Sequence, residues 1–224
     1  MFLTSDNKLK WKRIFMGAAI TLALVALGVV WYDRPLQLFI RNFNCGLWWF
    51  FDLVFDGTVW IFAAAVALAV FYFKKTVGTK SEDKSKYVFW GYVRDFFDKT
   101  KNSYAFYIFA SVFTAGITVK ILKTLIGRMR PVFYEEFGQT GCYPFSFDWA
   151  FNSMPSGHTT VTFAGLVMMG LLAPRYKVLT WTLAIMVAFS RVAVGAHWPT
   201  DVIFGAFLGM VIADIVKSVL SKRN

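Results

Sequence analysis

Residues that could act on a phosphoryl group stand in three short stretches, each next to a strongly apolar run. The stretches are Lys-x6-Arg-Pro at 123–131, Pro-Ser-Gly-His at 155–158 and Ser-Arg-x5-His-x3-Asp at 190–201. Polar groups at membrane depth are costly, so they mark functional sites by default. Lys123, Arg130 and Arg191 can together neutralise phosphoryl oxygens, because arginine binds them in a bidentate fashion and lysine adds a point charge.

The histidines add chemistry to this anion site. The chain has two histidines, His158 and His197, and both stand beside the cations. Asp201 follows His197 by one helical turn, so its carboxylate can accept a hydrogen bond from one ring nitrogen and leave the other free to attack phosphorus. His158 can then protonate the departing oxygen. Ser156 and Gly157 begin an apolar run, where free backbone N–H groups can point at the same anion.

The three stretches match, in residue type, spacing and order, the motifs of the type 2 phosphatidic acid phosphatase superfamily, and the chain resembles members of that family. The resemblance implies that His197 is a nucleophile that forms a phosphohistidine, that Asp201 orients it, and that His158 is the general acid. It also implies a phosphate-binding set of Lys123, Arg130, Ser156, Gly157 and Arg191. Members of the family are metal-independent and the sequence shows no cluster suited to a metal, so we expect no metal and no other cofactor.

The composition indicates a membrane protein. Of the 224 residues, 57% are hydrophobic and only 17% are charged, which lies outside the range of soluble domains. The net charge of +11 could suggest nucleic acid, but the basic residues cluster in loops between apolar runs rather than on one soluble face. We therefore expect the lipid bilayer and a membrane lipid substrate as partners, and no nucleic acid. The oligomeric state stays open.

The apolar runs that could cross a bilayer as helices define the expected architecture. We predict six spans, at 14–32, 57–73, 104–126, 157–172, 178–194 and 202–219. Between them we expect an interfacial segment at 33–56, a lysine-rich loop at 74–103 with an aromatic patch at 87–97 on the bilayer, and an ordered loop at 127–155. The prediction is an all-α, integral membrane six-transmembrane-helix bundle with an interfacial segment after helix 1, folded as one domain over 1–224.

Charge also predicts the orientation of the chain. Lysine and arginine are concentrated in the two tails and the even-numbered loops, so the positive-inside rule places both termini in the cytoplasm. The three motifs then share the extracytoplasmic face of the cell inner (plasma) membrane. Cys45 and Cys142 fall on the same face, where thiols can oxidise. A disulfide between them and two unpaired cysteines are both compatible with the sequence.

Residues near the motifs also have simpler interpretations. Lys120 and Arg128 are extra cations near the first motif, and we interpret them as side chains that snorkel to lipid headgroups. Gly205 and Gly209 have a spacing that lets helices approach closely, and packing within the chain is favoured over a dimer face.

The loop at 127–155 carries two further groups. We expect its carboxylates, Glu135 and Glu136, to be solvated. Its aromatic residues could wall a lipid entrance or be ordinary interface aromatics; they are Phe133, Tyr134 and Phe137.

The resemblance implies an integral membrane lipid phosphatase that works at the outer surface of the bilayer. Similar family members act on lipid A phosphates, undecaprenyl pyrophosphate or phosphatidylglycerol phosphate, and the loop at 127–155 favours the first two weakly. One alternative is a phosphotransferase that passes the phosphoryl group to a second lipid. Another is a non-enzymatic phospholipid carrier, although a carrier has no need of a nucleophile.

Overall fold

The computed structural model describes residues 2–77 and 89–222, in which the regular secondary structure is helical and two isolated β-bridges lie outside the helices. The all-α prediction is confirmed. The elements are α1 (Trp11–Leu27), a π-helical turn (Gly28–Tyr32), α2 (Asp33–Arg41), α3 (Gly46–Val54), α4 (Gly57–Val77), α5 (Phe89–Thr100), α6 (Tyr104–Ile126), α7 (Pro131–Phe137), a 3₁₀ turn (Trp149–Phe151), α8 (Gly157–Leu172), a 3₁₀ turn (Pro174–Tyr176), α9 (Lys177–Ala193) and α10 (Pro199–Ser221).

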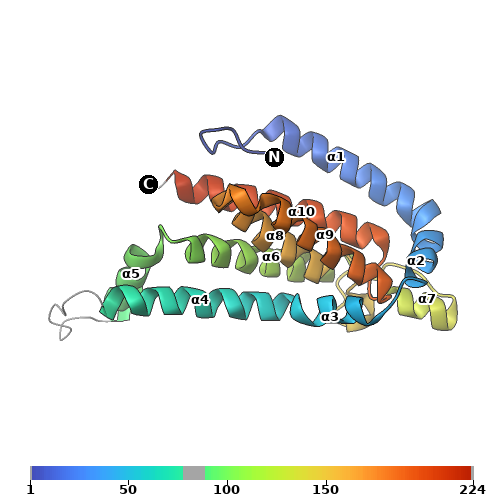
Figure 1. The fold of residues 1–224 in the computed structure, drawn as a ribbon. Helices are drawn as coiled ribbons and strands as arrows, with labels where there is room; N and C mark the ends of the chain where they lie inside the picture. Colours follow the sequence, from blue (N-terminus) through green and yellow to red (C-terminus); the bar gives the residue numbers. More distant parts are fainter. Residues whose placement is uncertain (1, 78–88, 223–224) are drawn as a thin grey trace.

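The long helices lie side by side, with the start of α1 and the end of α10 toward one end of the bundle (Figure 1). The short helices α2, α3 and α7 gather at the opposite end. The chain therefore has two distinct ends, one that carries the termini and one built from loops and short helices.

Five helices of the described chain are long and apolar enough to span a membrane, and they fall at Trp11–Arg41, Gly57–Thr76, Tyr104–Ile126, Pro174–Ala193 and Pro199–Ser221. The remaining predicted span is α8, an apolar helix of 16 residues. It packs against α6, α9 and α10, and eleven of its residues are buried. Because protein rather than lipid surrounds most of α8, it need not match the full thickness of the bilayer.

The predicted interfacial segment after helix 1 corresponds to α2 and α3. The π-helical turn joins α1 to α2, so the apolar helix runs without a break from Trp11 to Arg41. Asp33 and Gln37 of α2 are buried. A segment expected to lie on the bilayer thus turns two polar side chains toward the interior of the bundle.

The segment between α4 and α6 is described only in part. The lysine-rich loop predicted at 74–103 and its aromatic patch at 87–97 lie partly outside the described residues. Within the described part, α4 continues to Val77 and the remainder of the patch belongs to α5.

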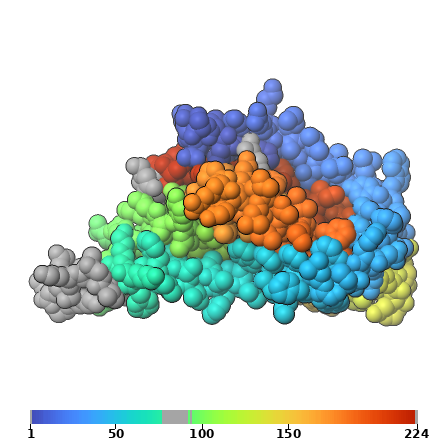
Figure 2. All heavy atoms as spheres, in the orientation of Figure 1, coloured from blue at the N-terminus to red at the C-terminus, as the bar shows by residue number. Residues whose placement is uncertain are grey.

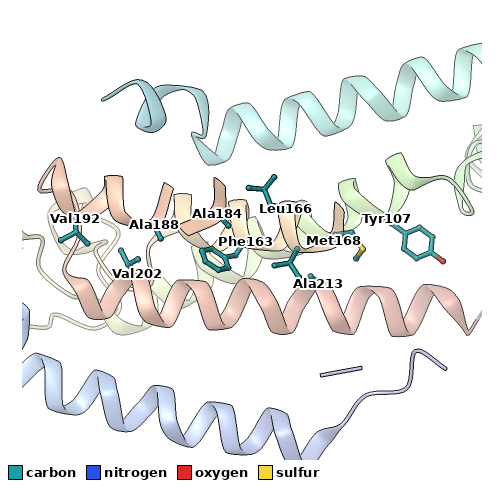
Figure 3. Close-up of a cluster of buried hydrophobic side chains, with 10 residues drawn as sticks. Tyr107, Phe163, Leu166, Met168, Ala184, Ala188, Val192, Val202 and Ala213 are labelled. Carbon is teal, nitrogen blue, oxygen red and sulfur yellow. The ribbon is translucent and has the colours of Figure 1, made fainter. Parts of the chain in front are cut away.

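The core lies where α8 meets α6, α9 and α10. Figure 3 shows its side chains pointing into the space between these helices. The buried cluster consists of Tyr107, Phe163, Leu166, Val167, Met168, Ala184, Ala188, Val192, Val202 and Ala213. Small residues on α9 and α10 opposite larger ones on α8 allow the close packing that fixes the position of α8.

Two glycines of α10 set how closely it approaches α8. A Cβ at Gly205 would lie 2.9 Å from the carbonyl oxygen of Ser156, and one at Gly209 would lie 2.5 Å from that of Thr160. The predicted packing within the chain is confirmed. It brings the start of α10 against the start of α8, so that two of the sequence motifs become neighbours.

The outer helices present apolar side chains to the surroundings. Figure 2 shows one face of the molecule, on which α9 lies between α1 on one side and α3 and α4 on the other. Exposed residues on these helices include Phe15, Ile20, Trp31, Phe62, Phe73, Val178 and Leu179. Such a surface is expected of helices that face lipid.

Candidate active site

The three motif stretches meet at the end of the bundle that carries α2, α3 and α7. A cavity of about 600 Å³ opens there, and Lys123, Arg130, His158, Arg191 and His197 all line it. These residues come from the end of α6, the loop before α7, the start of α8, the end of α9 and the α9–α10 loop. The fold thus brings both histidines and these three cations, drawn from separate helices and loops, to one cavity.

His197 is held by the start of α10. The residue is 1% exposed, and its Nδ1 lies 3.6 Å from Asp201 Oδ2, which is longer than a hydrogen bond. The same oxygen accepts hydrogen bonds from the Trp198 backbone N–H, at 2.9 Å, and from Ser153 Oγ, at 2.5 Å. Ser153 Oγ is also 3.5 Å from His197 Nδ1. The direct pair expected from the sequence is therefore replaced by a cluster in which Ser153 lies beside both residues.

Arg128 binds the carboxylate oxygen of Asp201 that does not face His197. Its guanidinium donates to Asp201 Oδ1 at 2.6 Å, to Thr200 Oγ1 at 2.7 Å and to Asp33 Oδ2 at 2.7 Å. Burial acts to lower the pKa of Arg128, but the Asp201 and Asp33 carboxylates outweigh it and raise that pKa above its usual value. The snorkelling interpretation of Arg128 was wrong, because two buried carboxylates draw the side chain inward.

His158 has carboxylate partners that the motifs do not contain. Its Nε2 lies 3.0 Å from Asp56 Oδ2 and 3.8 Å from Asp52 Oδ1. Asp56 stands just before α4 and accepts hydrogen bonds from the backbone N–H of Thr58, at 2.8 Å, and from its hydroxyl. Burial acts to raise the pKa of Asp56, yet these hydrogen bonds and the charge of His158 together lower it. An aspartate before an apolar run is a common helix cap, and nothing else in the sequence signals its contact with His158.

The three cations differ in their partners. Lys123 Nζ donates to the carbonyl oxygen of Asn152. The Arg130 guanidinium lies 4.3 Å from the centre of the Trp149 ring, and burial lowers the pKa of Arg130 to about 10 against the opposing charge of Asp201. Arg191 forms an ion pair with Asp52, while its Nε has no hydrogen-bond partner among the described residues.

Of the two residues at the start of α8, Gly157 lines the cavity and Ser156 does not. The backbone N–H of Ser156 donates to the carbonyl oxygen of Asp201 at 3.0 Å, so the prediction that this N–H is free for an anion was wrong. The reason is the close approach of α10 to α8. Ser156 is fully buried, whereas Gly157 lines the cavity.

Apolar residues extend the cavity along α4 and α6. Ile61 of α4 faces Phe113, Gly116 and Ile117 of α6, and Lys120 lies on the same wall. None of the three loop aromatics considered for a lipid entrance lines the cavity. Tyr134, for example, packs against Trp198 and lies under the guanidinium of Arg34.

Glu135 and the two cysteines also lie near this end of the bundle. Glu135 accepts a hydrogen bond from Gln37 at 2.9 Å and pairs with Arg41 at 3.0 Å. It is therefore not simply solvated, because the polar face of α2 lies against α7. Cys45 and Cys142 are both free and exposed, so the structure holds two unpaired cysteines rather than a disulfide.

Comparison with known proteins gives a consistent picture. The profile of the PAP2 superfamily matches residues 104–224. A lipid A 1-phosphatase from Rhizobium etli is 31% identical over 207 residues, which cover 90% of this chain and 81% of that protein. An undecaprenyl-diphosphatase from Sulfolobus acidocaldarius is 44% identical over 65 residues, which cover 27% of this chain and 30% of that protein.

A solved structure shares the fold. The PAP2-type phosphatidylglycerolphosphate phosphatase from Bacillus subtilis superposes with a TM-score of 0.57 at 19% identity, covering 94% of this chain and 97% of that one. Because the identity is low, this comparison supports the fold alone. Together with the profile match and the Rhizobium etli relative, it shows that this chain is a multi-pass membrane phosphatase that belongs to the PAP2 superfamily.

Proposed function

We propose that this phosphatase removes phosphate from a lipid phosphate or pyrophosphate through a phosphohistidine on His197. One observation carries the proposal: a single cavity holds two histidines and three cations at one end and apolar side chains at the other. The polar end suits a phosphoryl group, and the apolar end suits a hydrocarbon tail that enters between α4 and α6.

In the proposed first step, His197 Nε2 attacks phosphorus, because Nδ1 faces Ser153 and Asp201. The P–N bond forms as the P–O bond to the lipid breaks, and His158 gives its proton to the departing oxygen. In the second step, water attacks the phosphohistidine and passes a proton to His158. The P–N bond breaks, phosphate leaves, and both histidines return to their starting states.

Lys123, Arg130 and Arg191 would balance the charge on the phosphoryl oxygens in both steps. Hydrolysis of a phosphate monoester is among the slowest uncatalysed biological reactions, so the barrier must fall by upwards of roughly 20 kcal/mol. Charges that are already in place in the cavity can supply much of that reduction.

For the substrate, we propose a lipid A type phosphate as the first candidate, since the Rhizobium etli relative is named a lipid A 1-phosphatase and matches most of this chain. Undecaprenyl pyrophosphate and phosphatidylglycerol phosphate are the next candidates, by the names of the other relatives. A panel of these lipids and phosphatidic acid, assayed side by side with purified protein in detergent and EDTA, ranks them by kcat/KM.

The same assay tests the reaction type. We expect free phosphate from the wild type and none above background from His197→Ala. A labelled acceptor lipid instead of free phosphate would indicate a transferase. Binding of lipid without turnover would indicate a carrier, and normal turnover by His197→Ala would contradict the mechanism.

For the orientation, we propose that the active-site end faces away from the cytoplasm, as the distribution of basic residues favours. The free, exposed Cys45 precedes α3 at that end and offers a test. A membrane-impermeant maleimide should label Cys45 from outside intact spheroplasts, with a Cys142→Ser background to isolate it. Labelling only after lysis would reverse the proposed orientation.

A further inference from the structure

Two aspartates outside the three motifs border the anion site. Asp52 belongs to α3 and Asp56 precedes α4, so both come from the segment that joins these helices, here called the α3–α4 elbow (residues 52–58). The elbow lies outside residues 104–224, which the family profile covers. Carboxylates at a phosphate site repel the substrate, so their presence calls for a compensating role.

The carboxylate of Asp56 is held firmly in place. The Thr58 hydroxyl and backbone N–H both donate to its Oδ1, while Oδ2 stays free to meet His158 Nε2 at 3.0 Å. The elbow lies beside α8, since a Cβ at Gly57 would be in ordinary van der Waals contact with Val161 Cγ2, at 3.6 Å. Thr58 thus orients the Asp56 carboxylate so that its second oxygen faces His158 Nε2.

The charges around His158 explain what such an acceptor can do. Lys123 and Arg130 bring positive charge to the ring, and Arg191 and His197 line the same cavity. An imidazolium among these cations is electrostatically unfavourable. Asp56 at 3.0 Å and Asp52 at 3.8 Å supply the facing negative charge, and the Asp52 carboxylate is already paired with Arg191.

We propose that Asp56 is a positioning residue for the general acid of the reaction. It accepts a hydrogen bond from His158 Nε2–H, which fixes the ring and leaves Nδ1 to carry the proton toward the departing oxygen. Asp56 stays ionised throughout and balances the imidazolium charge; the proton that moves is the one on Nδ1. This inference rests on the proposed function, in which His158 protonates the leaving group.

The variant Asp56→Asn isolates the charge. Asparagine caps a helix as well as aspartate does, so the start of α4 should be kept while the carboxylate is lost. The readout is the leaving-group dependence of kcat/KM, which reports the steps up to departure of the leaving group. Octyl phosphate has a poor leaving group that needs a proton, whereas p-nitrophenyl phosphate has a good one that does not.

We expect Asp56→Asn to lower kcat/KM for octyl phosphate by about 10- to 100-fold, part of the 10²–10⁴ that general acid catalysis supplies. For p-nitrophenyl phosphate we expect a loss of less than about threefold, because that leaving group departs without protonation. A merely structural role would lower both values by the same factor. Equal losses, or no loss with either substrate, overturn the inference.

Asp52→Asn is the matched control. It removes a carboxylate of the same elbow, but one that pairs with Arg191, so its effect should be equal for the two substrates. If Asp52→Asn shows the same preference for the good leaving group, the assignment to Asp56 is wrong.

The wild type and His197→Ala, run in the same assays, separate this inference from the proposed function. An inactive wild type, or an active His197→Ala, overturns the proposed function and the inference with it. An active wild type with an inactive His197→Ala, combined with equal losses in Asp56→Asn, overturns the inference alone.

Discussion

The two parts of the chain on either side of the undescribed residues 78–88 contribute differently to the molecule. In residues 104–222, α9 and α10 each have 44% of their most apolar window buried within the protein. In residues 2–77, the corresponding values are 17% for the first apolar helix and 11% for α4. The C-terminal part therefore forms the core, and the N-terminal part mostly faces its surroundings.

At the active-site end, the two parts also carry opposite charges. The C-terminal part supplies both histidines and the cations Lys123, Arg128, Arg130 and Arg191. The N-terminal part supplies Asp33, Asp52 and Asp56, which contact Arg128, Arg191 and His158 in turn. A loosely packed set of helices thus provides counter-charges for a site that the tightly packed helices build. Asp33, Asp52 and Asp56 thus link the two parts through charge, and this contrast can be tested.

The largest effect is expected at Arg128, which bridges the two parts. Arg128→Met leaves the Asp33 and Asp201 carboxylates buried without their cation, which should cost about 3–5 kcal/mol of stability. The measurement is thermal unfolding in detergent, together with kcat. The control, Arg128→Lys, keeps the charge but cannot donate to both carboxylates at once. Its stability should fall between those of the wild type and Arg128→Met. Wild-type stability in Arg128→Met would mean that the bridge has no structural role.

A smaller loss is expected at Asp33, on the N-terminal side of the same bridge. Asp33→Asn keeps the size of the side chain but weakens its hydrogen bonds to Arg128 and Thr200, at a cost of about 1.5–3 kcal/mol. Because Arg128 also holds Asp201, kcat should fall as well. An unchanged kcat with lowered stability would restrict Asp33 to a structural role.

An added methyl group should destabilise the tightly packed C-terminal part more than the N-terminal part. A Cβ at Gly209 would lie 2.5 Å from the carbonyl oxygen of Thr160, whereas one at Gly46 meets nothing within 4 Å. We expect Gly209→Ala to lower stability by about 1–3 kcal/mol, and Gly46→Ala, its control, to leave it unchanged or slightly raised. Equal effects on the unfolding temperature would remove the contrast between the core and the outer helices.

The smallest effect is expected on acid stability. Burial, followed by the charges of Lys123 and Arg130, lowers the pKa of His197 well below its ordinary 6.5. Between the two values the unfolded chain binds a proton that the folded chain does not. Stability is therefore lost as the pH falls below about 6.5, by up to about 1.4 kcal/mol per pH unit.

His197→Gln removes this contribution. Between about pH 7.5 and about pH 5.5, the unfolding temperature of the wild type should fall further than that of the variant. Equal falls would mean that His197 titrates alike in the folded and unfolded chains.

The sequence predicted the features that depend on short-range spacing. The motifs identified Lys123, Arg130, His158, Arg191 and His197, and all five line one cavity. Long apolar runs identified the long helices, and the spacing of Gly205 and Gly209 indicated close packing within the chain, which the structure places between α8 and α10. In each case, the residues that carry the signal lie within one helix or one loop.

The features that could not be predicted from the sequence depend on contacts between distant segments. Asp56 looks like an ordinary helix cap and Arg128 like an ordinary flanking cation, because their partners are about a hundred and about seventy residues away. Ser153 stands three residues before a motif serine, yet only the fold puts it beside Asp201. Outside the motifs, nothing in the sequence indicated which charges meet across helices.

The central claim is that His197 carries the phosphoryl group during the reaction. Wild type, mixed with a labelled lipid phosphate and quenched in alkali within one turnover, should yield a phosphopeptide that contains His197 by mass spectrometry. The label should vanish under acid, as expected of a phosphohistidine. Label on any other residue, or steady turnover by His197→Ala, would contradict the account.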